Sequence, residues 1–119
     1  MLVDWIKYEN GQWCKLESLN LEQGHFDNMS GVYIIWQEAS NRRYIYVGQG
    51  FIKERLGDHR RNWKEQGIDT STFYVTWASV YDEYKDGIEL FLANILLPDF
   101  GERFPRKPPI PVNLPFPNK

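Results

Sequence analysis

The pattern of hydrophobic and polar residues predicts β-strands in three segments of the chain, one as an apolar run and two by alternation. Residues 31–36 (GVYIIW) are β-branched and aromatic, and residues 43–47 (RYIYV) follow after a short run of turn residues. Together these two segments predict an antiparallel hairpin. Residues 70–80 (TSTFYVTWASV) show the most regular alternation and predict a third strand. Gly48 and Gly50 are expected to end the second strand.

Two other segments show helical spacing. Residues 51–66 place apolar side chains at loosely helical intervals, and residues 86–97 form an apolar run that Asp86 opens and Pro98 closes. The order β-β-α-β-α predicts an α+β fold, a small three-stranded antiparallel sheet flanked by helices. The first 30 residues carry little pattern, although residues 12–19 (QWCKLESL) are compatible with a short strand.

The end of the chain differs from the rest in composition. All seven prolines of the 119-residue chain fall within residues 98–119, which excludes a long helix or a central strand there. The same stretch is rich in apolar side chains, so we expect an extended proline-rich tail that packs on the body or on a partner. Residues 1–119 are expected to form a single domain with its regular core at 31–97.

The composition is that of a globular protein, with 42% hydrophobic and 25% charged residues. The single cysteine, Cys14, allows no internal disulfide, and no stretch approaches the roughly 18 apolar residues of a membrane span. We therefore expect a cytoplasmic protein with no membrane contact. The aromatic share of 16% is typical of a small core filled with large side chains, and some rings are alternatively suited to stacking on bases.

Positive charge is concentrated around the hairpin and the first predicted helix. The net charge is −2, but residues 42–64 carry seven Lys and Arg against two acidic residues. Five of these basic residues are candidates for binding nucleic acid: Arg42, Arg43, Arg60, Arg61 and Lys64. A solvated helix face is the other interpretation of such a run.

Four polar side chains are expected to approach the same end of the sheet. Tyr33 and Tyr46 lie on adjacent strands, and Arg55 begins the helix that leaves the hairpin. His59 follows one helical turn later and shares a face with Arg55. A guanidinium recognises phosphate oxygens through paired hydrogen bonds, so the group predicts a phosphate site. Alternatively, the tyrosines are core residues and the other two are ordinary surface residues of a helix.

Glu89 stands inside the apolar run of the second predicted helix. A buried carboxylate must be paired or neutralised, and Mg²⁺ is often held by only one or two carboxylates together with water and substrate oxygens. In the alternative interpretation, Asp86 and Glu89 form a capping box at the start of the helix.

The order and spacing of these residues resemble the GIY-YIG endonuclease family. The matching residues are Gly31-Val32-Tyr33, Tyr46-Val47-Gly48, Arg55, His59 and Glu89, with Asn113 a looser match to an asparagine near the end of the family's domain. The likeness covers roughly residues 30–97. It implies a GIY-YIG-like fold and a metal-dependent endonuclease that hydrolyses phosphodiester bonds of DNA.

The resemblance also implies a role for each residue. Glu89 would hold one Mg²⁺ or Mn²⁺ on the scissile phosphate, and Arg55 would neutralise the charge that develops there. Tyr33 would position or deprotonate the attacking water with support from Tyr46, while His59 would assist proton transfer or bind phosphate. Forming a phenolate at neutral pH costs about 4 kcal/mol for an ordinary tyrosine, which favours an orienting role for Tyr33.

Some features depart from the family pattern. Asn113 lies beyond the proline-rich stretch. Tyr44 is expected to share a strand face with Tyr46, so that either tyrosine could occupy the motif position, although Gly48 favours Tyr46. No separate DNA-recognition domain is visible, so we expect a minimal catalytic unit, a homodimer, or a chain that works with a recognition subunit. The alternative function is a non-catalytic module of the same fold that binds nucleic acid or protein. In a third interpretation, the motif residues serve only the core.

Overall fold

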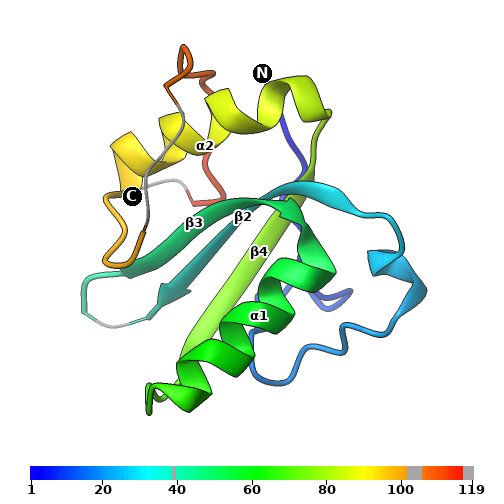
Figure 1. The fold of residues 1–119 in the computed structure, drawn as a ribbon, viewed down its shortest axis with the longest axis vertical. Coiled ribbons are helices and arrows are strands. Elements are labelled where there is room, and N and C mark those ends of the chain that lie inside the picture. Colours follow the sequence, from blue (N-terminus) through cyan, green and yellow to red (C-terminus); the bar gives the residue numbers. More distant parts are fainter. Residues whose placement is uncertain (39, 102–105, 117–119) are drawn as a thin grey trace.

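The computed structural model describes residues 1–38, 40–101 and 106–116 (Figure 1). Four strands form one antiparallel sheet, in the order β1-β4-β2-β3. The strands are β1 (Cys14–Lys15), β2 (Ser30–Gln37), β3 (Arg43–Phe51) and β4 (Phe73–Ser79). The helices are α1 (Ile52–Glu65), α2 (Asp82–Leu96) and a short 3₁₀ helix, η1 (Gly24–Phe26). The predicted α+β class is confirmed.

The prediction of three strands is wrong, because β1 adds a fourth strand at the edge of the sheet. Cys14 pairs with Val75 of β4, and Lys15 pairs with Tyr74. A strand of two residues is too short for alternation to reveal it, since the pattern of a strand repeats only every second residue. By pairing with β4, this short strand covers an edge that would otherwise present unpaired backbone groups.

Two predicted element boundaries are also wrong. The β3 strand continues past Gly48 and Gly50 to Phe51, because these glycines pair with Tyr33 and Gly31 of β2 instead of forming a turn. Helix α2 begins at Asp82, so Asp86 lies inside the helix. The capping box proposed for Asp86 and Glu89 therefore does not exist.

The two faces of the sheet bury separate cores (Figure 1). Helix α1 and the N-terminal loops cover one face, where Ile35, Val75 and Trp77 are buried. Helix α2 covers the other face, where Val32 and Ile34 are buried. This alternation in β2 follows from the period of two along a strand. No helix in the described part of the chain has the length and apolar character needed to cross a membrane.

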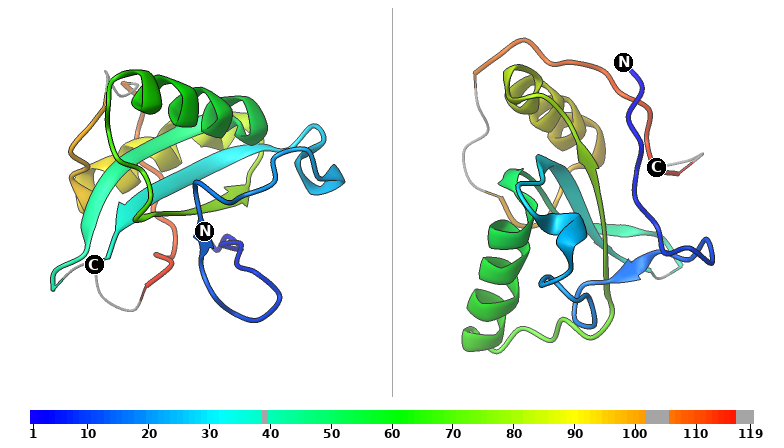
Figure 2. Two further views of the ribbon diagram at one scale, coloured as in Figure 1. Left: turned by 90° about the horizontal axis from the view of Figure 1, so that it is seen from below. Right: turned by 90° about the vertical axis from the view of Figure 1, so that its right-hand side faces the viewer.

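The described part of the proline-rich tail runs back over the α2 side of the molecule. Val112 and Phe116 are buried in the core on that side. The N-terminal segment lies beside the end of the tail (Figure 2), and the amino group of Met1 donates a hydrogen bond to the Pro111 carbonyl at 3.1 Å. The N-terminal segment and the described part of the tail therefore stabilise each other's position.

Candidate active site

Tyr33 and Tyr46 lie on the α1 side of the sheet with their rings nearly parallel. The ring centroids are 6.0 Å apart and the planes differ by 7°. Tyr33 is 0% exposed, and its hydroxyl lies 2.6 Å from Nε2 of His59. Tyr46 is half-buried. The two motif tyrosines therefore have different environments: one is sealed in the core and the other reaches the surface.

Gly48 provides the space in which the Tyr33 side chain lies. A Cβ atom at position 48 would be 2.4 Å from the Tyr33 hydroxyl oxygen, far inside van der Waals contact. Any larger residue would push the phenol away from its present place. This close approach explains physically why a glycine follows Tyr46 and Val47 in the motif.

Tyr44 and Tyr46 do not share a face of the sheet, so that expectation is wrong. The β2–β3 ladder shifts its register between Ile35 and Trp36, where Ile35 pairs with Tyr46 and Trp36 pairs with Tyr44. Ile45 is the extra residue of a β-bulge. Tyr44 is consequently buried in the core on the α2 side, and Tyr46 alone occupies the motif position.

Tyr33 and His59 form a neutral hydrogen-bonded pair. Burial raises the pKa of Tyr33 above its ordinary value, although the nearby Arg55 charge opposes the shift. Burial, followed by the Arg55 charge, lowers the pKa of His59 to about 4. At neutral pH the phenol is therefore the donor and Nε2 the acceptor, so the imidazole proton is on Nδ1. The shared proton stays on Tyr33.

Arg55 lies in the first turn of α1, beside both phenols. Its Nη2 atom donates a hydrogen bond to the Tyr46 hydroxyl at 3.3 Å. Its Nε atom is buried and has no hydrogen-bond partner among the described residues. Gly50 adjoins the side chain with φ +129°, and a Cβ there would be 3.3 Å from Cγ of Arg55. An unsatisfied buried N–H costs about 1–3 kcal/mol, which an anionic oxygen would recover.

Glu89 belongs to the middle of α2 and is half-buried. Burial raises the pKa of its carboxyl to about 7, and the Asp86 charge adds to the increase, whereas the Arg55 charge opposes it. The Glu89 charge in turn contributes to the raised pKa of Tyr33. The carboxylate is therefore electrostatically coupled to the Arg55 guanidinium and the Tyr33 phenol. Hydrogen bonds and ring contacts join Tyr33, Tyr46, Arg55 and His59 into one cluster, and these charge effects couple Glu89 to it.

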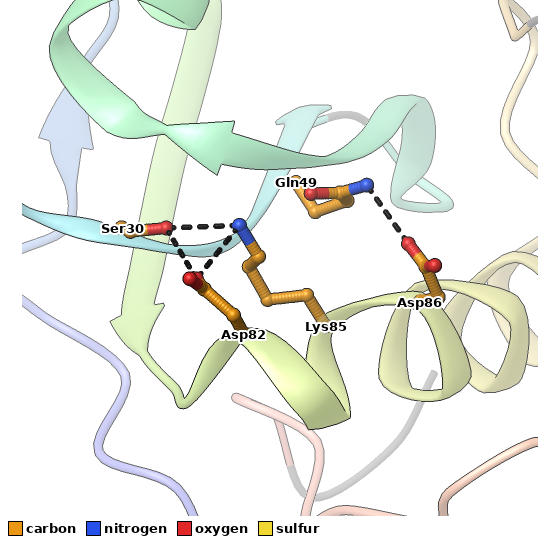
Figure 3. Close-up of polar contacts among 5 residues, drawn as sticks. All are labelled: Ser30, Gln49, Asp82, Lys85 and Asp86. Atoms are coloured by element: carbon orange, nitrogen blue, oxygen red, sulfur yellow. Dashed lines mark hydrogen bonds and ion pairs between the residues drawn. The ribbon is translucent and has the colours of Figure 1, made fainter.

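Polar contacts that were not predicted from the sequence join α2 to β2 and β3 (Figure 3). Gln49 of β3 donates a hydrogen bond from Nε2 to Oδ1 of Asp86 at 3.0 Å. The Lys85 ammonium forms an ion pair with Asp82 at 3.0 Å and donates to the Ser30 hydroxyl at 3.1 Å. The alternation of side chains along β3 could have predicted the Gln49–Asp86 contact, because it turns Gln49 toward the α2 face.

The four arginines predicted to bind nucleic acid make contacts within the chain. Arg60 donates to the carbonyl oxygens of Leu16 and Leu19, at 3.3 and 2.7 Å. Arg42 pairs with Glu38 and stacks over the Phe116 ring.

Ion pairs also engage two of the more exposed arginines. Arg43 pairs with Asp99, and Arg61 pairs with Asp58. Exposed pairs of this kind contribute little stability, so a phosphate could replace their carboxylates at small cost. Lys64 borders a shallow hollow that Glu17 and Ile68 also line. Binding of nucleic acid by any of these residues stays a prediction.

Asn113 joins the tail to the N-terminal segment. Its side chain accepts a hydrogen bond from the Val3 amide at 2.7 Å and donates one to the Val3 carbonyl at 3.1 Å. Its own carbonyl accepts from the Trp5 indole at 2.8 Å. The side-chain amide therefore has a structural role, and none of its described contacts links it to the five clustered residues.

Comparison with protein-family models, curated proteins and solved structures finds no match to this chain. The function is therefore inferred from the residues of the candidate site.

Proposed function

We propose that this chain is a metal-dependent endonuclease of the GIY-YIG type that hydrolyses phosphodiester bonds of DNA. The observation that carries the proposal is the contact between Tyr46 of β3 and Arg55 of α1, with the Tyr33–His59 pair packed beside them. The Arg55 charge also opposes the rise in the pKa of Glu89 of α2 that burial causes, which supports including this carboxylate in the site. A phenol, a guanidinium and a carboxylate provide the groups needed to orient a nucleophile, stabilise a phosphate and hold a cation.

The carboxylate side of the site fits a divalent cation. Asp86 and Glu89 lie three residues apart on α2, and the Asp86 charge contributes, after burial, to the raised pKa of the Glu89 carboxyl. Hard oxygen ligands of this kind suit Mg²⁺ or Mn²⁺. Within the described ranges no group of three or more His, Cys, Asp or Glu ligands occurs. A Mg²⁺ ion held by one or two carboxylates would complete its coordination with water and substrate oxygens. When bound, the cation would polarise the phosphate and stabilise its developing charge.

Arg55 is the residue suited to hold the scissile phosphate. Its buried Nε lacks a partner among the described residues, and Tyr46 fixes the orientation of the guanidinium through Nη2. A guanidinium that is already oriented before the reaction stabilises charge in the transition state without a cost of reorganisation. A substitution at Arg55 should therefore reduce the rate of the chemical step.

The two tyrosines are suited to different tasks. Tyr46 is half-buried and contacts Arg55, so it is the phenol that can orient a water molecule at the surface of the site. Tyr33 is sealed and donates a hydrogen bond to His59, so it positions the ring of Tyr46 instead of contacting water. His59 is 8% exposed and acts through Tyr33 rather than on the phosphate directly.

A non-catalytic module that binds nucleic acid or protein is the second candidate function. The exposed arginines Arg43 and Arg61 favour it, because their ion pairs contribute little stability and a phosphate could replace the carboxylates at small cost. In that case the chain would bind DNA with a strong salt dependence but would not cut it.

Cleavage assays distinguish these candidates. Purified protein is incubated with plasmid and single-stranded DNA in the presence of Mg²⁺ or Mn²⁺. We expect cleavage by the wild type and by Glu83→Gln, which changes an exposed carboxylate at the start of α2, and a loss of about 100-fold or more in Glu89→Gln. Equal rates for the two variants, or intact DNA with the wild type, would contradict the nuclease proposal.

A further inference from the structure

A hollow at the β1 edge of the sheet is lined by aromatic and polar side chains. Its volume is about 500 Å³, which lies within the range of about 300–1,000 Å³ found for small-ligand sites. In the strand order β1-β4-β2-β3, the β1 and β3 edges are three strand spacings, or about 14 Å, apart. The hollow is therefore separate from the candidate active site, which lies at the β3 edge.

Three aromatic side chains from different parts of the chain line this hollow: Tyr8, Trp13 and Tyr74. Tyr8 is 40% exposed, and the other two are half-buried. The buried Trp36 contacts both half-buried rings. Its ring centroid is 5.4 Å from that of Trp13, which meets it edge-on, and 5.8 Å from that of Tyr74, which stacks on it. The core therefore fixes two of the three rings in place.

A tight turn supports the third ring, that of Tyr8. The Gly11 amide donates a hydrogen bond to the Tyr8 carbonyl, and the Tyr8 amide donates one to the Gln12 carbonyl, each at 2.9 Å. Gly11 has φ +80°, a left-handed conformation that glycine adopts without steric cost. The Asn10 side chain also accepts a hydrogen bond from the Gln12 amide at 3.0 Å. Tyr8 and Gln12 therefore border the hollow on a hydrogen-bonded turn.

Two exposed lysines place ammonium groups over the rings of this hollow. The Lys7 nitrogen is 4.3 Å from the centroid of the Trp13 ring, and the Lys15 nitrogen is 5.9 Å from that of Tyr74. Neither ammonium forms an ion pair with a carboxylate of the described residues. The hollow thus combines flat aromatic side chains with positive charge that no described carboxylate neutralises.

We infer that this hollow binds an unpaired nucleotide, with the base against the aromatic rings and the phosphate on the ammonium groups of Lys7 and Lys15. Stacking on an aromatic ring accepts any base, and it is stronger than the contact of an exposed ammonium with the same ring. A lysine can therefore move from the ring to the phosphate when a base arrives. Such binding needs neither a cation nor the residues of the candidate active site, so it is independent of the proposed nuclease activity.

The other polar groups of the hollow are compatible with this ligand. Glu38 is the one carboxylate among the described lining residues, and its ion pair with Arg42 at 3.1 Å reduces its repulsion of a phosphate. The Gln12 amide can donate to or accept from the edge of a base. An acidic peptide would match the positive charge alone and would leave the aromatic rings without a stacking partner.

The first measurement is equilibrium binding of a fluorescently labelled single-stranded pentanucleotide, in EDTA so that no strand is cut. We expect Tyr8→Ala to bind about five- to 150-fold more weakly than the wild type, and Tyr8→Phe, which keeps the ring, to retain binding. Lys15→Gln should reduce the slope of log K against log salt by about 0.7, because one phosphate contact is lost. Lys107→Gln removes an exposed charge beside a separate hollow between α2 and the tail, and this matched control should change neither quantity.

The second measurement locates the nucleotide by NMR. The five tryptophans give five indole N–H signals, and the signal that is absent in Trp13→Phe is that of Trp13. Adenosine monophosphate or the pentanucleotide should shift this signal, both in the wild type and in Arg55→Gln. Equal affinity for the two probes would assign the hollow to free nucleotides, and tighter binding of the pentanucleotide would assign it to a single strand.

Three results would overturn nucleotide binding at this hollow. They are an unchanged Trp13 signal with both probes, equal affinity of Tyr8→Ala and the wild type, and a Trp13 signal that a polyglutamate peptide shifts while neither nucleotide probe does. DNA cleavage enters none of these measurements, so the hollow and the nuclease can fail separately.

Discussion

At the scale of single residues, the buried Tyr33–His59 pair shows how the core protects a polar contact. Removing a phenol or an imidazole from water is costly unless a hydrogen bond compensates, and each of these residues satisfies the other at 2.6 Å. The imidazole accepts the bond only while it is neutral. Protonation of His59 would place a charge in a nearly sealed site beside the Arg55 guanidinium.

This pair predicts a specific dependence of stability on pH. The pKa of His59 is about 4 in the folded protein, below its ordinary value of 6.5, because burial and then the Arg55 charge oppose protonation. Below pH 6.5 the unfolded chain takes up a proton that the folded chain does not, so the free energy of unfolding should fall as the pH falls toward 4. His59 should account for a loss of at most about 3 kcal/mol.

Urea denaturation at a series of pH values measures this contribution. His59→Gln keeps an acceptor for Tyr33 but does not titrate, so its free energy of unfolding should fall less steeply than that of the wild type between pH 6.5 and 4. Other groups titrate in this range in both proteins, and the difference between the two curves isolates His59. Parallel curves would show that His59 is not held neutral.

The residues of the site could largely be predicted from the sequence, but their roles could not. Spacing alone suggested that Tyr33, Tyr46 and Arg55 approach one end of the sheet. It could not distinguish the sealed phenol from the half-exposed one, since both lie in similar apolar strands. The error over Tyr44 has a definite cause: one extra residue, Ile45, inverts the faces of the strand that precedes it.

At the scale of elements, the position of α2 depends on its contact with the tail. Gly87 lies in the interior of the helix, between Asp86 and Ile88, where glycine is unfavourable. A Cβ at this position would be 2.7 Å from Ile110 side-chain atoms and 2.8 Å from the Pro108 carbonyl oxygen. The Ile110 amide donates a hydrogen bond to the Gly87 carbonyl at 2.9 Å. The tail therefore lies against the helix that carries Glu89.

Alanine substitutions at two helical glycines test this contact. Gly87→Ala should lower the free energy of unfolding and reduce DNA cleavage, because the tail must move and α2 loses its support. Gly57→Ala in α1 is the matched control, since its Cβ would meet only Leu21, at an ordinary 3.8 Å. This control should raise the free energy of unfolding by about 0.5–1 kcal/mol through better helix propensity. Equal stabilisation by both substitutions, measured by denaturation, would show that the tail does not pack closely on α2.

The elements that the sequence analysis predicted poorly are those that long-range contacts define. The β1 strand exists only because β4 offers it an edge, and β3 extends through two glycines because β2 pairs with them. Likewise, α2 starts at Asp82, earlier than Asp86, and the Lys85–Asp82 ion pair and the contact with Ser30 join its first turn to β2. The local pattern of hydrophobic and polar residues gives no information about contacts with residues that are distant in the sequence.

At the scale of the whole molecule, the site forms where three elements meet at the β3 edge of the sheet. Strand β3 is the last strand of the sheet, and α1 and α2 cover opposite faces beside it (Figure 1). At an edge of such a three-layer fold, side chains from both faces can approach one another. This arrangement is consistent with the effect of the Arg55 charge, from α1, on the pKa of Glu89 in α2.

The central claim is that Arg55 and Glu89 act on one phosphate as a unit. Single-turnover cleavage of DNA by Arg55→Gln, Glu89→Gln and the double variant tests it most directly, with thermal unfolding to verify that each variant is folded. We predict that each single substitution slows cleavage by about 100-fold or more and that the double variant is no slower than the slower single variant. Independent, multiplying losses, or wild-type cleavage by either single variant, would contradict the account.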